Sequence, residues 1–365
     1  MAVYKSKNAT KDGRQYYFRI KYKDIFGVAH DYSSPKFKNK RDAENEEALY
    51  RIKIANQETT ISNVTFEHIF NEYIISLSKN VKPQTTLRNK YMFERLKPLH
   101  SLIINDFNIQ KYRQFQYELE NHKFSIDYTN KIIELLRRLI TYSNKYYGTS
   151  NKMLNYIEKY KKVNELKKEM DFFTYEEYMK FDSAIDNFEY HTFFEILFYM
   201  GLRQGEAQAL TWKDIDFKNN TLKVTKTLTT KIKGEKWTIS SPKTKSSTRI
   251  LPLTKKLVKD LKTMNNNAKK YKNFSNSWFV FGNAFPFPET TIQQRKNNYC
   301  KMADIKQIRI HDFRHSCATL LINNGASITL VSKWLGHADI SITLKVYAHL
   351  YENELNKMAN ILNNL

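Results

Sequence analysis

Alternating aromatic and polar residues near the start of the chain predict a small β-sheet. The stretch Gln15–Lys23 (QYYFRIKYK) alternates apolar with polar side chains, which is the pattern of a half-buried strand. Val28–Ser33 has the pattern of a second strand, and the region of Tyr4 can supply another. Lys40–Asn56 is helical in pattern, with acidic residues in its early turns, where they suit the helix dipole. Residues 1–57 are therefore expected to form a three-stranded sheet with one helix.

A change of pattern after residue 57 predicts an all-helical domain. Glu58–Asn63 is mostly polar and suits a linker, and apolar residues then recur at helical spacing up to residue 165. Pro98 and Asn105–Asn108 interrupt the pattern. We expect residues 58–169 to form a helical domain, with helices near Phe66–Ser78, Thr85–Leu96, Ile109–Asn121 and Ser125–Tyr147.

A mixed pattern begins near residue 170. Thr174, followed by Glu177 three residues later, is typical of a capping box at the start of a helix. The stretches TLKVTKTLTT, KWTIS and TRILPL between residues 221 and 253 alternate like strands, and helical patterns return after residue 289. Residues 170–365 are predicted to be a mainly helical domain with an inserted basic β-hairpin sheet, which gives the whole chain a multidomain α+β fold.

The charge balance points to a polyanion as the partner. The chain has 365 residues, with 60 Lys and Arg against 37 Asp and Glu, and a formal net charge of +23. The excess is spread over all three segments, so each of them is expected to contact the same polyanion. A content of 41% hydrophobic and 14% aromatic residues excludes a disordered chain.

Several classes of protein are excluded by what the sequence lacks. Only two cysteines occur, Cys300 and Cys317, which excludes a disulfide framework and a four-cysteine zinc site. No Walker-type loop or dinucleotide fingerprint is present, so neither ATP nor NAD is expected. The first residues carry no signal-peptide pattern, and the most apolar stretch, Thr192–Leu202, is too short to span a membrane. We therefore expect a reducing cytoplasmic setting.

Four fragments of the third segment carry residue types suited to phosphate chemistry. They are GLRQGE at 201–206, PKTKSS at 242–247, HDFRH at 311–315, and LGH at 335–337 with VYAH at 346–349. Each alone is a weak signal, but the ordered set resembles the tyrosine recombinase (phage-type integrase) family. The family pattern is an arginine, a hairpin lysine, His-x-x-Arg, Gly-His and a nucleophilic tyrosine. Those positions are filled here by Arg203, Lys243, His311, Arg314, His337 and Tyr347.

The resemblance covers about residues 171–350 and implies a site-specific DNA recombinase. Such an enzyme cleaves and rejoins duplex DNA through a 3′-phosphotyrosyl intermediate, here to integrate or excise a mobile element of a bacterial host. On weaker patterns, residues 1–57 are similar to an arm-type DNA-binding domain and residues 58–169 to a helical core-binding domain, which precede the catalytic domain 170–365. The expected setting is the bacterial cytoplasm, in association with the nucleoid.

The chemistry of phosphodiester cleavage explains these residue types. Two guanidinium groups, on Arg203 and Arg314, can clamp both non-bridging oxygens, with His337 as a further donor. His311 lies one helical turn before Arg314 and can accept the phenol proton or bind the phosphate. Glu206 is expected to orient Arg203. No metal and no ATP are expected as cofactors.

The nucleophile and the general acid follow from the same resemblance. A tyrosine ester of phosphate has a leaving group with a pKa near 10, so a DNA hydroxyl can reverse it. The distance from Gly336-His337 selects Tyr347 over Tyr351, which lies one turn further on. Lys243 is the expected general acid for the leaving 5′ oxygen, with Lys245 as the alternative. His315 and His349 are expected to be structural or to support other groups.

The expected partners are double-stranded DNA, at core and arm attachment sites, and further copies of the chain. A tetramer on DNA is implied, with the apolar face of residues 353–365 docked on a neighbouring protomer, and accessory DNA-bending or excision proteins are possible. Alternatives are a non-catalytic DNA-binding protein and a topoisomerase-like nicking and sealing enzyme. Basic residues singled out for contact with DNA are Arg14, Arg19, Lys21, Lys82, Arg88, Lys90, Lys245 and Arg249.

Overall fold

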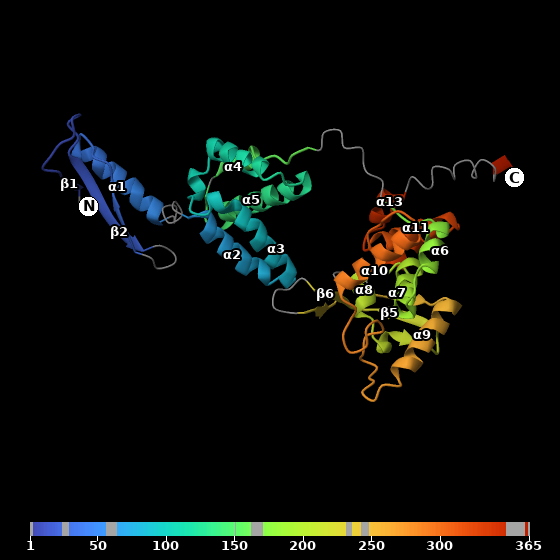
Figure 1. Cartoon of the computed structure of the whole chain (residues 1–365). Coiled ribbons are helices and arrows are strands. Elements are labelled where there is room, and N and C mark those ends of the chain that lie inside the picture. Colours follow the sequence, from blue (N-terminus) through green and yellow to red (C-terminus); the bar gives the residue numbers. More distant parts are fainter. Residues whose placement is uncertain are drawn as a thin grey trace. The chain divides into compact units, whose positions relative to one another are not determined.

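The chain divides into two compact units, residues 1–165 and residues 166–365, which we describe separately (Figure 1). The structure is a computed structural model. It describes residues 3–23, 29–55, 64–149, 151–161, 171–230, 236–241, 248–347 and 362–363. Within these ranges no helix combines the length and the apolar character that crossing a membrane requires.

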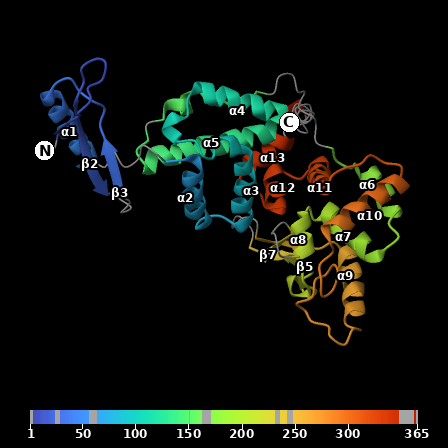
Figure 2. The ribbon, with the colours of Figure 1, turned by 60° about the vertical axis from the view of Figure 1, so that its left-hand side comes forward.

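An antiparallel sheet and one helix open the first unit, as the sequence predicts. Strands β1 (Val3–Lys5), β2 (Tyr16–Lys23) and β3 (Ala29–Ser33) pair in the order β1-β2-β3. Helix α1 (Lys40–Ala55) packs against β2 (Figure 2). The buried side chains include Phe18, Ile20 and Ala43, and the rings of Tyr32 and Tyr50 stack at 4.0 Å. This alternation of buried and exposed residues along β2 confirms the strand pattern.

The rest of the first unit is helical. Helices α2 (Phe66–Ser78), α4 (Ile109–Asn121) and α5 (Ile126–Tyr146) lie where the sequence predicts them, and Thr65, Asn108 and Ser125 cap their first turns through side-chain oxygens. Short 3₁₀ turns occupy Ile104–Asp106 and Lys152–Asn155. The predicted helix Thr85–Leu96 is instead α3 (Pro83–Phe93), followed by a 3₁₀ turn at Glu94–Leu99. The helix begins earlier because proline suits the first helical turn.

Helices surround an aromatic core in the second unit. Helix α7 (Phe188–Tyr199) is apolar on nearly all sides and contacts α8 (Gln204–Ala209), α9 (Lys255–Ala268) and α11 (Asp312–Asn323). Helix α6 (Tyr175–Ser183) begins with the predicted capping box of Thr174 and Glu177. The remaining helices are α10 (Glu289–Met302), α12 (Ile328–Leu335) and α13 (Ile340–Tyr347).

In the described part of this unit the strands pair as two sheets, where the sequence predicted one hairpin sheet. Strands β4 (Ile215–Asp216), β5 (Thr221–Val224) and β8 (Arg249–Pro252) pair in the order β4-β5-β8. Strand β6 (Thr227–Thr229) pairs with β7 (Thr238–Ser240) alone. The stretch from residue 221 to residue 230 is therefore two strands. It is interrupted at Lys226, whose Nζ lies 2.7 Å from Asp214 and 2.8 Å from the hydroxyl of Thr211.

Gly205 allows α8 to lie directly against β6. A Cβ at this position would lie 2.5 Å from the carbonyl oxygen of Leu228 and 2.7 Å from the hydroxyl of Thr227. Since backbone cannot move as easily as a side-chain end, a larger residue must separate the two elements.

Replacing Gly205 with alanine is expected to lower the free energy of unfolding of the second unit by about 1–3 kcal/mol, because the methyl group overpacks this contact. Urea unfolding followed by tryptophan fluorescence measures it, since all four tryptophans, Trp212, Trp237, Trp278 and Trp334, lie in that unit. Gln204→Ala, on the neighbouring residue, is the matched control. An unchanged unfolding midpoint for Gly205→Ala would contradict the packing argument.

Candidate active site

A buried carboxylate joins two arginines at the start of α8. Arg203 is the residue before the first turn, and its Nη1 donates to Oε1 of Glu206 at 2.8 Å. Nη2 of Arg249, at the start of β8, donates to Oε2 at 3.0 Å. Burial alone would raise the pKa of Glu206, but the charges and hydrogen bonds of Arg249 and Arg203 outweigh it and lower that pKa. Glu206 is thus ionised and holds both guanidinium groups in place.

Arg314 lies on α11 and is almost fully buried, with 2% of its surface exposed. Its Nη1 donates to the carbonyl oxygen of Gly201 at 2.9 Å. Gly201 has a φ of 61°, in the left-handed region, and a Cβ there would lie 2.6 Å from the side chain of Leu335. Glycine therefore lets the end of α7 turn toward α11 and present this carbonyl to Arg314.

Arg314 keeps a hydrogen-bond donor that no described residue uses. Its Nη2 is buried, and no partner among the described residues accepts a hydrogen bond from it. Burial and the neighbouring charge of Arg203 lower the pKa of Arg314 to about 9, although Glu206 acts in the opposite direction. A buried cation beside further cations is stabilised by an anion that accepts the remaining donors. The site can therefore bind a phosphate group.

Two predicted histidines lie near these arginines. His311 is the residue before α11, and desolvation together with the charges of Arg314 and Arg203 lowers its pKa. His337 follows Gly336, whose left-handed conformation ends α12, and its Nδ1 lies 2.7 Å from the hydroxyl of Thr343. Burial, followed by the charges of Arg314 and Arg203, lowers the pKa of His337 to about 4. Both rings are therefore neutral near pH 7.

Tyr347, at the end of α13, contacts His315 and not His311. Its hydroxyl lies 2.6 Å from Nδ1 of His315, and its ring is buried with 4% of the residue exposed. Burial raises the pKa of Tyr347 and lowers that of His315 to about 4, so a neutral imidazole faces a neutral phenol. From the sequence, His311 was expected to accept the phenol proton or to bind the phosphate, and His315 was expected to be structural or to support other groups. The sequence did hold a signal for His315. It lies four residues after His311, so both rings share one helix face, and their centroids are 5.1 Å apart.

Comparisons with known proteins identify the family of the chain. The chain matches the phage integrase family over residues 168–354, the range that contains Arg203, Arg314 and Tyr347. It is 31% identical to the ICEBs1 integrase of Bacillus subtilis, over 83% of this chain and 84% of that protein. The chain belongs to the phage integrase family. As a tyrosine recombinase, it is an enzyme that breaks and rejoins DNA strands.

Other relatives extend the likeness over most of the recombinase. A XerC-like tyrosine recombinase of Caldanaerobacter subterraneus is 25% identical over 99% of each chain. The Tn1549 transposon integrase, solved with a circular intermediate DNA, superposes with a TM-score of 0.66 at 21% identity, over 81% of this chain and 99% of that one. A lambda integrase tetramer bound to a Holliday junction superposes with a TM-score of 0.59 at 14% identity, over 92% of this chain and 95% of that one. These two structures share the fold of the recombinase.

The remaining predicted site residues of the recombinase fall into three groups. Lys243 and Lys245 lie outside the described residues, as do most of residues 353–365. Arg249 was predicted to contact DNA, but its side chain is only 6% exposed and pairs with Glu206, so its charge acts inside the site. The other candidates stay predictions: Lys82 is half-buried, and the exposed ones are Arg14, Arg19, Lys21, Arg88 and Lys90.

Glu206→Gln is expected to lower the free energy of unfolding of the recombinase by about 3 kcal/mol near neutral pH, because it leaves two guanidinium groups without their counter-charge. The folded pKa of Glu206 is depressed, so this stabilisation is complete above the ordinary glutamate value of 4.5 and is lost as the pH falls through the lower folded value. Urea unfolding of both proteins at about pH 7 and about pH 3 measures the change. A difference that stays constant over this range would contradict the assigned ion pairs.

Proposed function

We propose that this recombinase integrates or excises a mobile element by site-specific strand exchange, with Tyr347 as the nucleophile. One observation carries the proposal: two chemical groups meet at α11. Arg314, on α11, has a buried guanidinium with an unused donor. The hydroxyl of Tyr347 is hydrogen-bonded to the neutral ring of His315, also on α11. An anion-binding group and an activated phenol are the two things that transfer of a phosphodiester to tyrosine requires.

The proposed reaction has two balanced halves. The oxygen of Tyr347 attacks the scissile phosphorus, its proton passes to His315, and the bond from phosphorus to the 5′ oxygen breaks. The leaving 5′ oxygen receives a proton from Lys243, or from Lys245, and a 3′-phosphotyrosyl bond remains. Arg203 and Arg314 bind the two non-bridging oxygens, and His337 donates a further hydrogen bond. In the reverse half, a 5′-hydroxyl of the partner strand attacks the phosphorus and passes its proton to the lysine. The bond from phosphorus to Tyr347 breaks, and the tyrosine oxygen takes its proton back from His315. Neither half uses a metal or ATP.

The domains of the recombinase have separate proposed tasks. Residues 1–57 bind arm-type sites, residues 58–169 bind the core site, and residues 170–365 carry the chemistry. Supporting observations are the exposed basic residues Arg14, Arg19 and Lys21 on and before β2, and Arg88 and Lys90 on α3. Tetramer formation on paired sites, docking of residues 353–365 on a neighbouring protomer, and accessory bending or excision proteins complete the proposal, in the bacterial cytoplasm. Solved relatives that carry DNA support the choice of partner.

Recombination between defined sites tests the proposal. The DNA beside the gene is searched for a repeated attachment sequence, and a supercoiled plasmid with two copies is incubated with the full chain. We expect exchange products that depend on both copies, and binding that weakens steeply with salt because backbone contacts release counterions. Relaxation of plasmids without any site would instead indicate a topoisomerase-like enzyme, and binding without cleavage would indicate a non-catalytic protein.

His315→Gln separates proton transfer from positioning. Glutamine can still hydrogen-bond the hydroxyl of Tyr347 but cannot take its proton, so cleavage is expected to slow by about 10²-fold, the lower end of the range for a general base. In the variant the rate should rise with pH between about 7 and 9, because solvent hydroxide must then remove the proton. The wild-type rate should stay flat, since the pKa of His315 is lowered to about 4. Single-turnover cleavage against pH measures both, and identical profiles would refute a proton-accepting role.

A further inference from the structure

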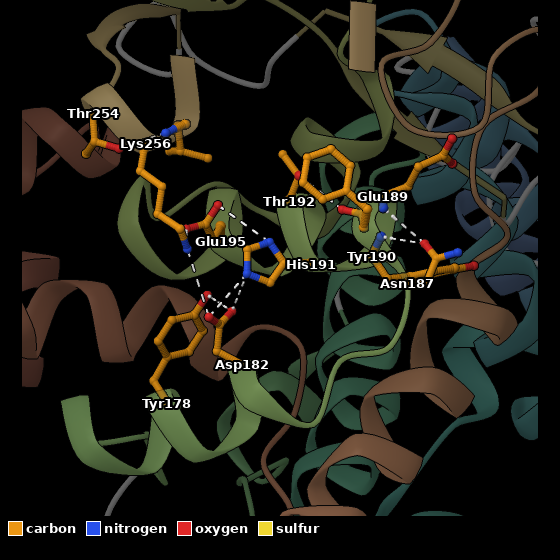
Figure 3. Close-up of polar contacts among 12 residues, drawn as sticks. Tyr178, Asp182, Asn187, Glu189, Tyr190, His191, Thr192, Glu195, Thr254 and Lys256 are labelled. Carbon is orange, nitrogen blue, oxygen red and sulfur yellow. Dashed lines mark hydrogen bonds and ion pairs between the residues drawn. The ribbon is translucent and has the colours of Figure 1, made fainter. Parts of the chain in front are cut away.

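A second polar cluster lies between α7 and α9 and takes no part in the proposed reaction (Figure 3). His191 and Glu195 lie one turn apart on α7, and Asp260 lies on α9. One ligand-type atom of each, a ring nitrogen or a carboxylate oxygen, lies within 4.8 Å of the other two. The sequence does not reveal this cluster, because α7 and α9 are far apart in the chain.

Three atoms in this cluster are buried without a hydrogen-bond partner among the residues that the structure describes. They are Nδ1 of His191, Oε2 of Glu195 and Oδ2 of Asp260. Glu195 is the most enclosed of the three residues, with 1% of its surface exposed. Its Oε2 lies 3.9 Å from Nδ1 of His191, too far for a hydrogen bond. Buried polar atoms of a native protein normally have a partner. We therefore expect a bound group between these three atoms that contacts all of them.

The far side of the His191 ring is held as in histidines that bind metals. Its Nε2 lies 3.2 Å from the carboxylate of Asp182, which also accepts a hydrogen bond from Tyr178 at 3.3 Å (Figure 3). A carboxylate that accepts the N–H of one ring nitrogen leaves the lone pair of the other nitrogen free and raises its basicity. Nδ1, which faces Glu195, is therefore the nitrogen that can bind a cation.

The net charge of the cluster is negative enough to balance a divalent cation. Lys256 forms an ion pair with Oε1 of Glu195 and lies 4.0 Å from Asp182. The three carboxylates of Asp182, Glu195 and Asp260 thus face one ammonium group, which leaves two negative charges uncompensated. Without a cation, a proton is the alternative: the hydrogen bond to Asp182 raises the pKa of His191, and burial raises the pKa of Glu195. A proton satisfies one atom of the three, whereas a metal ion can satisfy all of them.

We propose that His191, Glu195 and Asp260 bind a divalent ion of the zinc class that ties α7 to α9. One imidazole nitrogen and two carboxylate oxygens suit zinc better than calcium or magnesium, which prefer oxygen alone. In a tetrahedral site with bonds of about 2.1 Å, ligand atoms lie about 3.4 Å apart, so Nδ1 and Oε2, now 3.9 Å apart, must move closer by about half an ångström when the ion binds. All three ligand atoms lie within 4.8 Å of one another, which small side-chain rotations can close. Water fills the fourth position. The ion is structural, so the proposal is independent of the strand-exchange chemistry.

Cobalt binding to the full chain tests this site directly. The protein is freed of metal with a chelator, titrated with Co²⁺, and followed by visible absorption, which reports tetrahedral coordination; Zn²⁺ should then displace the cobalt. We expect one Co²⁺ per chain for the wild type, and loss of the absorption for Asp260→Asn and for His191→Gln. Asp182→Asn, which removes the charge behind His191, should weaken binding about 10–100-fold.

The matched control is Glu189→Gln, which removes a carboxylate from the same helix at a position outside the cluster (Figure 3). It should bind Co²⁺ as the wild type does, and circular dichroism should show that all four variants are folded. Failure of the wild type to bind Co²⁺ or Zn²⁺ stoichiometrically would overturn the proposal. So would equal binding by Asp260→Asn and the wild type.

Discussion

Arg314→Lys is expected to lower the rate of DNA cleavage by about 10²–10³-fold, the usual cost of removing one preorganised donor from a developing charge. Lysine keeps the positive charge but is a single point donor, whereas the guanidinium reaches the carbonyl of Gly201 through Nη1 and keeps Nη2 for a phosphate oxygen. The substitution thus removes the second, fixed hydrogen-bond donor and keeps the positive charge. Binding of DNA should change little, because backbone contacts spread over the chain supply most of the affinity.

Single-turnover cleavage and equilibrium binding, measured on the same substrate, separate these effects. Arg295→Lys is the matched control. Arg295, on α10, pairs with Asp186 and lies over the ring of Tyr190, and it takes no part in the proposed chemistry. It should cleave at the wild-type rate. Cleavage by Arg314→Lys within about twofold of the wild type would mean that this guanidinium does not bind the reacting phosphate.

Local signals in the sequence predicted most helices well. The helices Phe66–Ser78 and Ile109–Asn121 were predicted at their observed bounds, since apolar periodicity and a capping residue act within the segment itself. The break at Lys226 was not predictable in this way. Lys226 pairs there with Asp214, a residue on another element, and strand patterns carry no information about such partners.

The candidate site was likewise predicted only in part from local signals. The order of the motifs named Arg203, Arg314 and Tyr347, because the chemistry requires those residue types. It could not tell which histidine meets the phenol, since His311 and His315 share a helix face and only the path of α13 brings Tyr347 to His315. The pairing of Arg249 with the buried Glu206 could not be predicted either, because strand patterns carry no information about such partners.

Tyr347→Phe is expected to abolish covalent attachment to DNA altogether. The phenol oxygen is the atom that forms the bond to phosphorus, so its removal leaves no nucleophile, while the ring still fills the apolar cluster of Cys317, Val331 and Leu335. The variant should therefore fold and bind DNA. The reaction of solvent with the phosphate is too slow to replace the lost step on this time scale.

Formation of a covalent adduct on a nicked suicide substrate tests the central claim most directly. The nicked duplex carries the attachment repeat, so that cleavage releases a short strand and traps the enzyme, and the adduct is resolved by denaturing gel electrophoresis. Tyr351→Phe, four residues further along the sequence, is the matched control. We expect an adduct for the wild type and for Tyr351→Phe, and none for Tyr347→Phe. An undiminished adduct with Tyr347→Phe would contradict that claim.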